Sequence, residues 1–210
     1  MALLTGKQQL EHLGPRSGNF QIKKGQAVAV RKTSTITASA SWKSVTDYDI
    51  YALVLFTDGH VETVSQFGTK KHPHDFTPSV ANGAIKHLGD IGREAQGDAV
   101  ETVEISLTDD IAAVAIVAYS AQSNGTGSFY RYKVGLKVDN GAGAVIGVSA
   151  ENANDDDQIY TCVPAIIRNT PKGVDIEAVE LYSKRSSEKR PAFNRHGDIE
   201  MDAGPENAYK

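Results

Sequence analysis

The sequence predicts an all-β protein, an antiparallel β-sandwich of two sheets with long loops and a polar C-terminal tail. Segments that alternate apolar and polar residues recur along the chain, with turn-forming residues between them at intervals of about ten residues. Asp58-Gly59 and Asn140-Gly141 are dipeptides typical of tight hairpin turns. No segment keeps the period of a helix over a convincing length, so strands are expected throughout.

The first half of the chain predicts three strands and one long loop. "TITASASW" alternates strictly and places Ile36 and Trp42 on an apolar face, which is typical of a half-buried strand. "YDIYALVLF" is apolar at nearly every position, as a central strand would be, and the Asp58-Gly59 turn predicts that "HVETVSQF" returns beside it. Residues 68–86 contain glycines and two prolines, which predicts a long loop with one short helical turn.

The second half predicts a further series of strands. "IAAVAIVAYS" from Ile111 is the most apolar run and predicts a buried strand. Asn140-Gly141 separates two of the others, and "NTPKG" is a turn between the last two. The remaining predicted strands are "AVETVEISL", "FYRYKVGLKV", "AVIGVSA", "IYTCVPAII" and "VDIEAVELY".

These patterns divide the chain of 210 residues into three parts. Residues 1–20 are polar and predict a loosely ordered N-terminal arm. Residues 21–183 carry all the predicted strands and form one β-sandwich domain. Residues 184–210 are charged and aperiodic, which predicts a flexible charged tail.

Composition narrows the classes of function. The net charge is −4, which argues against a uniform nucleic-acid-binding surface. Cys162 is the one cysteine, so the chain can form neither an internal disulfide nor a cysteine-based zinc site. The start lacks the apolar core of a signal peptide, and no run approaches the ~18 apolar residues of a membrane span. We therefore expect a soluble, cytoplasmic protein of bacterial type.

Two acidic segments are candidates for metal binding. "GDIGREAQGDAVE" combines glycines with Asp90, Asp98 and Glu101 at the start of a predicted strand, and calcium prefers such carboxylate and carbonyl oxygens on a sharply bending loop. Asp47 and Asp49 stand two apart at the start of "YDIYALVLF", on one face, where a shared cation would relieve their repulsion. The alternative is that both segments are solvated turns.

Taken together, the two segments resemble the TerD-type tellurium-resistance and stress-response family. The first family motif, an aspartate pair entering a strand that is followed by a glycine turn, corresponds to "DYDIYALVLFTDGHV". The second, an acidic glycine loop entering a strand, corresponds to "HLGDIGREAQGDAVETVEISL". "IKKGQ", Trp42 and the last four predicted strands also fit, so the resemblance covers about residues 20–183.

The resemblance implies a β-sandwich that binds calcium through the two acidic loops. The implied ligands are Asp47, Asp49, Asp90, Asp98 and Glu101, with a backbone carbonyl from Ile91. This chain departs from the family pattern at four positions, where Val45, Tyr51, Ile91 and Ala99 replace oxygen-bearing residues. Calcium affinity follows ligand charge and number, so these departures imply a weakened or lost site.

The remaining candidates have simpler explanations. His72 and His74, with His87 further along, could hold zinc, but a solvated loop is the preferred explanation, because the intervening proline and the loop context do not favour ligand geometry. Asp155 to Asp157 form an acidic run typical of a solvated turn, and the basic residues of the tail are flanked by acids. The chain shows no nucleophile elbow, phosphate-binding loop or metalloprotease motif, and Cys162 lies in a predicted buried strand. We therefore expect no enzyme.

The resulting hypothesis is a non-catalytic calcium-binding module of a bacterial stress or tellurite-resistance system. The metal would order the two acidic loops, and protein partners of a stress-response complex would bind the ordered surface. The alternative hypothesis is a metal-free interaction or self-assembly protein on the same sandwich, acting through edge strands, the long loop or the tail.

Overall fold

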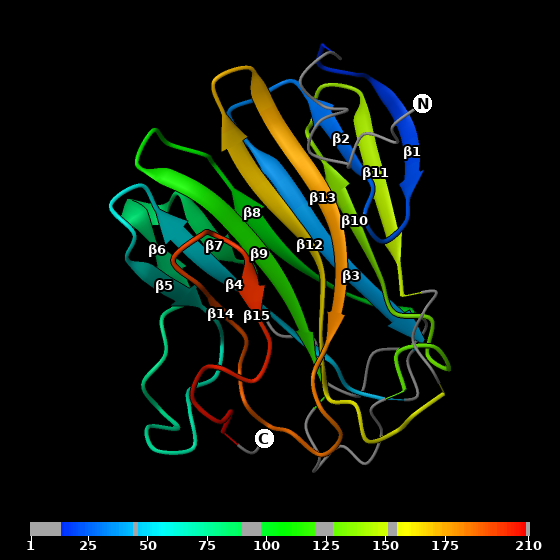
Figure 1. The fold of residues 1–210 in the computed structure, drawn as a ribbon, viewed down its shortest axis with the longest axis vertical. Helices are drawn as coiled ribbons and strands as arrows, with labels where there is room; N and C mark the ends of the chain where they lie inside the picture. The colour runs from blue at the N-terminus through cyan, green and yellow to red at the C-terminus, as the bar shows by residue number, and fades with distance from the viewer. Residues whose placement is uncertain (1–13, 44–45, 90–97, 121–127, 151–154, 209–210) are drawn as a thin grey trace.

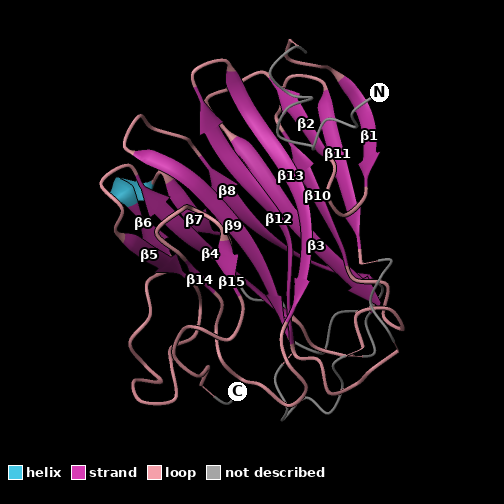
Figure 2. Ribbon diagram, viewed as in Figure 1, coloured by secondary structure: helices cyan, strands magenta, loops and turns pink. Residues whose placement is uncertain are grey.

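The computed structural model describes residues 14–43, 46–89, 98–120, 128–150 and 155–208. As predicted, the fold is an all-β sandwich of two large sheets, and the one short helix in the described part is the 3₁₀ turn η1, Ala81–Gly83 (Figure 2). Both long sheets twist in the same sense and lie face to face (Figure 1).

The first sheet has seven strands and consists, in spatial order, of β1 (Gly18–Ile22), β11 (Ala144–Ser149), β10 (Gly135–Asp139), β3 (Ile36–Lys43), β8 (Asp98–Ile105), β7 (Ile85–His87) and β6 (Ser79–Val80). Its neighbours are antiparallel except β1 and β11, which run parallel. Residues 18–20 belong to β1, so the N-terminal arm expected over residues 1–20 is wrong for its last three residues.

The second sheet has six strands, all antiparallel to their neighbours: β2 (Ala27–Val30), β13 (Gly173–Tyr182), β12 (Thr161–Thr170), β9 (Ile111–Tyr119), β4 (Asp49–Phe56) and β5 (Val61–Val64). The predicted Asp58-Gly59 turn joins β4 to β5, with Gly59 at a φ of 93°, and the predicted Asn140-Gly141 turn joins β10 to β11. Both hairpin predictions are confirmed.

The two ends of the sandwich differ. We call "hairpin end" the end that holds the turns at Asp58-Gly59, Asp109-Asp110 and Thr170–Gly173. We call "loop end" the opposite end, where β4 and β8 begin and β3, β9 and β13 finish, as the registers Asp49↔Tyr119 and Lys43↔Asp98 show. In Figure 1 the loop end is the lower end.

Apolar side chains fill two separate cores. The larger core lies between the sheets, and β3 contributes alternate residues such as Ile36 and Trp42 while its other residues face solvent. A second core lies on the outer face of the six-stranded sheet, where Tyr51, Leu53 and Tyr119 are buried. β4 and β9 are therefore apolar on both faces, which explains their continuous apolar sequences.

Residues 184–208 cover this second core, so the expectation of a flexible tail over 184–210 is wrong for its described part. The segment crosses the outer face and forms the hairpin of β14 (Ala192–Phe193) and β15 (Ile199–Glu200) (Figure 1). Phe193, Ile199 and Met201 pack against the second core. These few apolar residues lie in a polar sequence and are too few to establish a period, and for this reason periodicity could not reveal them.

Ending the chain at Ser183 is expected to expose Tyr51, Leu53 and Val117 and to cause unfolding or aggregation, because the second core loses its cover. Size-exclusion chromatography and thermal unfolding measure both effects. The control is Arg195→Ala, an exposed position of the same segment, which is expected to leave both unchanged. A monomeric truncated chain with an unchanged melting temperature would contradict the structural role of the segment.

Candidate functional site

The residues predicted to bind calcium belong to the loop end, as far as the structure describes them. Asp47 lies two residues before β4 and Asp49 is the first residue of β4. Asp98 is the first residue of β8 and pairs with Lys43, but its side chain lies outside the described part, as do Asp90 and Ile91. Glu101 is the fourth residue of β8.

Glu101 and His87 hold the start of β4 to the opposite sheet. The Ile50 amide donates a hydrogen bond to Glu101 Oε2 (2.8 Å), and His87 Nε2 lies 3.0 Å from the Ile50 carbonyl oxygen. β5 pairs with β4 only from Ala52 onward, so the backbone groups of Ile50 on that edge have no strand partner. The two side chains from β7 and β8 replace the missing strand, and we call this arrangement the Ile50 clip.

The hydrogen bonds around His87 indicate the tautomer of its ring. The Gly89 amide donates to His87 Nδ1 (3.1 Å), so Nδ1 acts as an acceptor and the proton of a neutral ring is assigned to Nε2. That proton faces both the Ile50 carbonyl and Glu101 Oε2, which lies 3.5 Å away. Both side chains are 1% exposed, so the pair is part of the interior of the sandwich rather than of its surface.

Asp49 and Glu101 lie on different sides of β4. Asp49 is directly opposite Tyr119 on β9, so the two side chains share the outer face that Tyr119 and Tyr51 help to bury. Glu101 reaches Ile50 from the seven-stranded sheet, on the inner side. Within residues whose side chains are described, no three His, Cys, Asp or Glu residues are grouped so as to hold a metal ion.

The three histidines considered for zinc are not brought together. His72 and His74 are exposed in the loop between β5 and β6, whereas His87 is buried in the Ile50 clip. Cys162 is buried in β12 as predicted, and burial, with Glu180 nearby, raises the pKa of its thiol. A protonated, inaccessible thiol is unsuited to nucleophilic or redox chemistry.

Arg190 anchors the C-terminal segment to the loop between β5 and β6. Its Nε donates to Asn207 Oδ1 (2.6 Å), and its Nη2 donates to the carbonyl oxygens of Phe67 (3.1 Å) and Gly68 (2.8 Å). The guanidinium carbon lies 5.0 Å from the centre of the Tyr51 ring and 5.1 Å from that of Phe67. Although burial lowers the pKa of Arg190, a guanidinium remains charged, and the two rings stabilise that charge.

The same loop is bound to the end of the segment by its backbone. Lys70 donates its amide to the Glu206 carbonyl (2.9 Å), and the Ala208 amide donates to the Gly68 carbonyl (3.1 Å). Gly68 is required here, since a Cβ at this position would lie 2.1 Å from the His72 carbonyl oxygen. The loop is therefore held in one compact conformation.

Three lysines surround one carboxylate on this loop. Lys70 Nζ lies 2.8 Å from Glu206 Oε2, and this hydrogen bond and charge, with smaller contributions from Lys189 and Lys71, lower the pKa of Glu206. Lys189 also pairs with Glu206 through a backbone bridge. We call Lys70, Lys71 and Lys189 the basic surface; with Glu206 they leave a local excess of positive charge on a chain of net charge −4.

Two acids of the predicted solvated run are paired at the loop end. Asp155 Oδ1 accepts hydrogen bonds from Ser128 Oγ (2.6 Å) and Arg131 Nε (3.1 Å), which lower the pKa of the carboxyl. Asp156 Oδ2 lies 2.7 Å from Arg185 Nη1. These carboxylates have basic partners within the chain.

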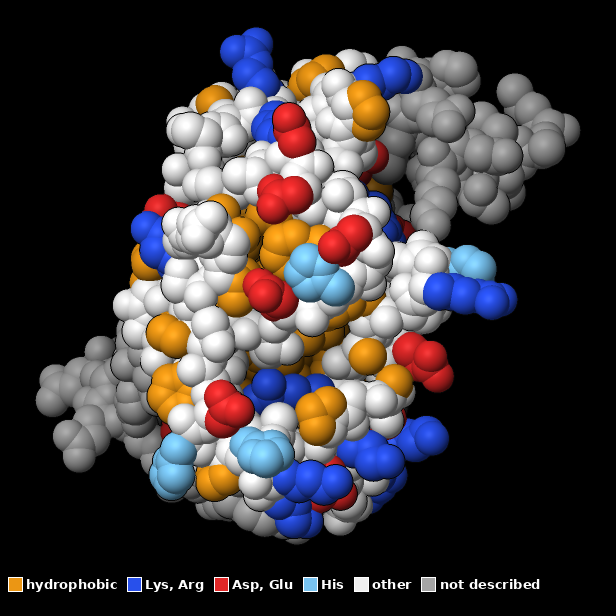
Figure 3. Space-filling model, turned by 90° about the vertical axis from the view of Figure 1, so that its left-hand side faces the viewer, with side chains coloured by type: hydrophobic (Ala, Val, Ile, Leu, Met, Phe, Trp, Pro, Cys, Tyr) orange, Lys and Arg blue, Asp and Glu red, His pale blue; other side chains and the backbone are white. Residues whose placement is uncertain are grey.

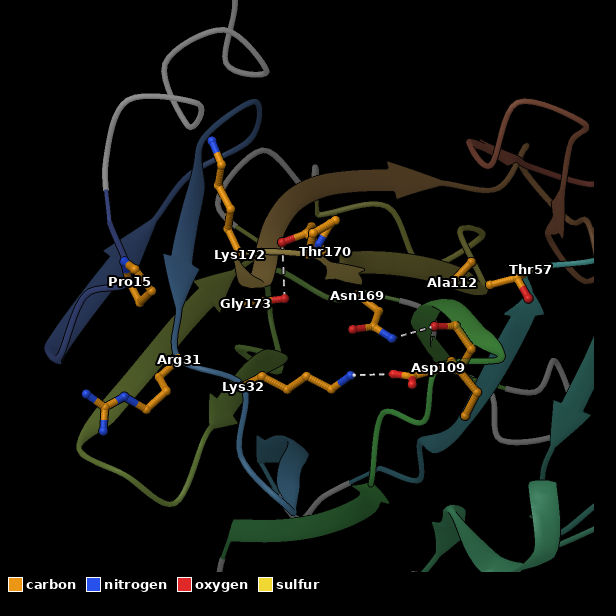
Figure 4. A pocket seen from close by; sticks show the side chains of 12 residues that line it. Pro15, Arg31, Lys32, Thr57, Asp109, Ala112, Asn169, Thr170, Lys172 and Gly173 are labelled. Atoms are coloured by element: carbon orange, nitrogen blue, oxygen red, sulfur yellow. Dashed lines mark hydrogen bonds and ion pairs between the residues drawn. The ribbon is translucent and has the colours of Figure 1, made fainter.

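A shallow cleft of about 600 Å³ lies at the hairpin end, lined in part by Arg31, Lys32, Asp109 and Lys172. Figure 4 shows Lys32 directed at Asp109, 3.7 Å away, while Arg31 and Lys172 point away from each other. The cations of the cleft do not converge on a common point, so their arrangement does not form a binding site for an anion.

Comparison with known proteins supports the fold but assigns neither a family nor a function. No family model matches the chain, and no curated protein matches it. The chain is similar to a solved structure described as "Crystal structure of unknown function protein SAV2460", with 12% identity, a TM-score of 0.53, and coverage of 83% of this chain and 94% of that one. Membership of the TerD-type family stays a prediction. None of the helices among the described residues is long and apolar enough to cross a membrane.

The Ile50 clip predicts that two glutamates of β8 contribute differently to the free energy of unfolding. Glu101→Ala is expected to lower the free energy of unfolding by about 1–3 kcal/mol, because the buried Ile50 amide loses its acceptor. Glu104→Ala is the matched control on the same strand, since the Glu104–Lys86 pair is partly exposed and is expected to contribute at most about 1 kcal/mol. Urea unfolding measures both, and equal losses would contradict the clip.

Arg190→Ala is expected to lower the free energy of unfolding by about 2–4 kcal/mol, because three hydrogen bonds and two ring contacts are lost. Protease sensitivity of the bonds near Lys70 and Lys71 is expected to rise as the loop detaches. Limited trypsin digestion with mass spectrometry measures this, with Arg195→Ala as the exposed control. An unchanged cleavage rate in Arg190→Ala would show that Arg190 does not anchor the loop.

Proposed function

We propose that the protein is a non-catalytic binding module whose loop end holds a calcium ion between its two acidic segments. The hydrogen bond from the Ile50 amide to Glu101 carries the proposal, because it ties the second residue of β4 to β8 three residues after Asp98, the first residue of β8. Asp47 and Asp98 belong to segments far apart in sequence that meet at this end. Carboxylate oxygens from two such loops are the donors that calcium prefers.

The described geometry supports separate roles for the six implied ligands. Glu101 is a positioning residue, since its Oε2 accepts the Ile50 amide proton inside the sandwich. Asp49 shares the outer face with Tyr119, away from Glu101. The ligand roles then fall to Asp47, Asp90, the Ile91 carbonyl and Asp98, of which the structure describes only the Asp47 side chain.

When bound, calcium would supply positive charge that links the two segments. It would replace repulsion among carboxylates by shared coordination and so reduce the freedom of both loops. The ordered loop end would then present one surface to a partner. A place in a bacterial stress or tellurite-resistance system, with protein partners from a stress-response complex, is supported by the sequence resemblance alone.

Thermal unfolding of metal-stripped protein tests the calcium proposal. Calcium at ~100 times its dissociation constant is expected to add about 2.7 kcal/mol of stability, whereas magnesium is expected to add much less. Asp98→Asn is expected to remove the calcium response, and Glu101→Gln is expected to keep it while lowering the melting temperature with and without the metal. Asp109→Asn at the hairpin end is the control acid.

An absent calcium response, or one that survives in Asp98→Asn, would overturn the two-segment site. Loss of the response in Glu101→Gln alone would instead make Glu101 a direct ligand. An absent response would favour the metal-free interaction protein, for which the basic surface is the specific structural support.

A further inference from the structure

Three Asn-Gly pairs occur in the sequence, at Asn82-Gly83, Asn124-Gly125 and Asn140-Gly141, and the structure describes the first and the third. An asparagine before glycine can react with its own main chain, because the glycine carries no side chain that would shield its amide nitrogen from the asparagine carboxamide. Whether the reaction occurs in a folded protein depends on how firmly the carboxamide and the turn are held. The two described pairs differ in both respects.

Hydrogen bonds fix the Asn140-Gly141 pair. Asn140 is 1% exposed, and its Oδ1 accepts hydrogen bonds from two backbone amides of its own turn, both at 2.9 Å. Its Nδ2 donates to the Arg31 carbonyl oxygen (3.2 Å), and the Gly141 amide donates to Asp139 Oδ1 (2.8 Å). Both the carboxamide that would be attacked and the nitrogen that would attack it are therefore engaged.

The Asn82-Gly83 pair occupies the turn between β6 and β7. The Ala84 amide donates to the Ala81 carbonyl oxygen (3.0 Å), and φ is 53° at Asn82 and 88° at Gly83, as in a type I′ turn. Asn82 is exposed, and no hydrogen bond holds its side chain within the described part of the chain. The turn lies at the left-hand rim of the sandwich in Figure 2, on the side that faces the viewer in Figure 3, so water reaches it.

The turn that holds Asn82 can open more easily than the turn that holds Asn140. Ala81 also has a positive φ, 50°, a left-handed conformation that is unfavourable for alanine. β6 has two residues and β7 has three, and they lie at the edge of the seven-stranded sheet, so few strand hydrogen bonds oppose opening. The Asn140 turn joins β10 and β11, which have five and six residues and are paired on both sides.

We propose that Asn82 is a site of spontaneous deamidation and isoaspartate formation in the folded protein. The Gly83 nitrogen attacks Asn82 Cγ and forms a new N–Cγ bond, the Cγ–Nδ2 bond breaks, and Nδ2 leaves as ammonia with the proton of the Gly83 amide. Water then opens the resulting ring at either carbonyl carbon. One product has aspartate at position 82, and the other has isoaspartate, in which the main chain runs through Cγ. Water is the only co-reactant.

The two products are expected to affect the hairpin of β6 and β7 differently. Aspartate, like asparagine, is tolerated in the left-handed conformation, so the first product keeps the turn. Isoaspartate adds a methylene group to the main chain between positions 82 and 83, which displaces the Ala84 amide from the Ala81 carbonyl oxygen. β7 carries His87, which is bonded to the Ile50 carbonyl, so damage to the hairpin weakens the Ile50 clip. The isoaspartate form is therefore expected to melt at a lower temperature.

Ageing of the full chain at mildly alkaline pH, followed by tryptic peptide mapping with mass spectrometry, tests the proposal. The three pairs fall in separate peptides, residues 72–86, 94–131 and 138–168, so reaction at Asn124 does not affect the comparison. Asn82 is expected to deamidate about tenfold faster than Asn140 in the folded protein, because its turn opens locally. In guanidinium chloride the two rates are expected to become similar, because an unfolded chain protects neither pair. Enzymatic methylation of isoaspartyl carboxylates is expected to label peptide 72–86.

Two substitutions of Asn82 separate the reaction from other effects of ageing. Asn82→Gly keeps a type I′ turn and removes the carboxamide, so it is expected to abolish isoaspartate in this peptide and the fall in melting temperature on ageing. Freshly prepared Asn82→Asp mimics the first product and is expected to melt like the unmodified protein. Circular dichroism confirms that each variant is folded.

Equal rates at Asn82 and Asn140 in the folded protein would overturn the proposal, as would an Asn82 that stays intact in the folded protein while the unfolded chain reacts. Deamidation at Asn82 without methylation of peptide 72–86 would reject the isoaspartate product. An equal fall in melting temperature on ageing of Asn82→Gly would show that modification of Asn82 does not destabilise the hairpin.

Discussion

The outer face of the six-stranded sheet has to be covered, and the architecture of the loop end follows from that requirement. β4 and β9 carry apolar residues on both faces, so one face is buried between the sheets and the other needs a separate cover. Residues 184–208 provide this cover. Arg190 then fixes the segment beside Tyr51 and Phe67, and the same guanidinium holds the loop between β5 and β6. The position of the basic surface thus depends on how the second core is closed.

Much of the fold could be predicted from short-range patterns. Alternation in β3 and the glycine turns after β4 and β10 identified strands and hairpins, because these features depend on neighbouring residues only. The unbroken apolar sequences of β4 and β9 also indicated that both of their faces were buried. The identity of the outer cover was not predictable in this way, since Phe193, Ile199 and Met201 are isolated in a polar sequence. Their role depends on contacts with a cluster built from β4, β9 and β12, which are distant from these residues in the chain.

The candidate site shows the same division between local and long-range information. The sequence indicated that acids gather where β4 and β8 begin, and the structure joins the start of β4 to the first half of β8 through Ile50 and Glu101. The sequence could not indicate that β5 pairs with β4 only from Ala52 onward. The Ile50 amide and carbonyl are therefore left for Glu101 and His87 to bond. A buried carboxylate that accepts a backbone hydrogen bond and one that coordinates a metal have the same sequence signature. Only the partner of the oxygen atom distinguishes them.

Rigid placement and chemical function are closely linked at the loop end. A surface of flexible lysines would lose conformational entropy on binding any partner, and that loss would offset part of the attraction. The charge of Lys70 is offset by that of Glu206, and this ion pair, with the adjoining backbone bonds, keeps Lys71 and Lys189 near each other. One neutralised lysine therefore stabilises the arrangement in which the other two can act. The closure of a hydrophobic core and the presentation of a charged surface are, in this protein, consequences of the same C-terminal segment.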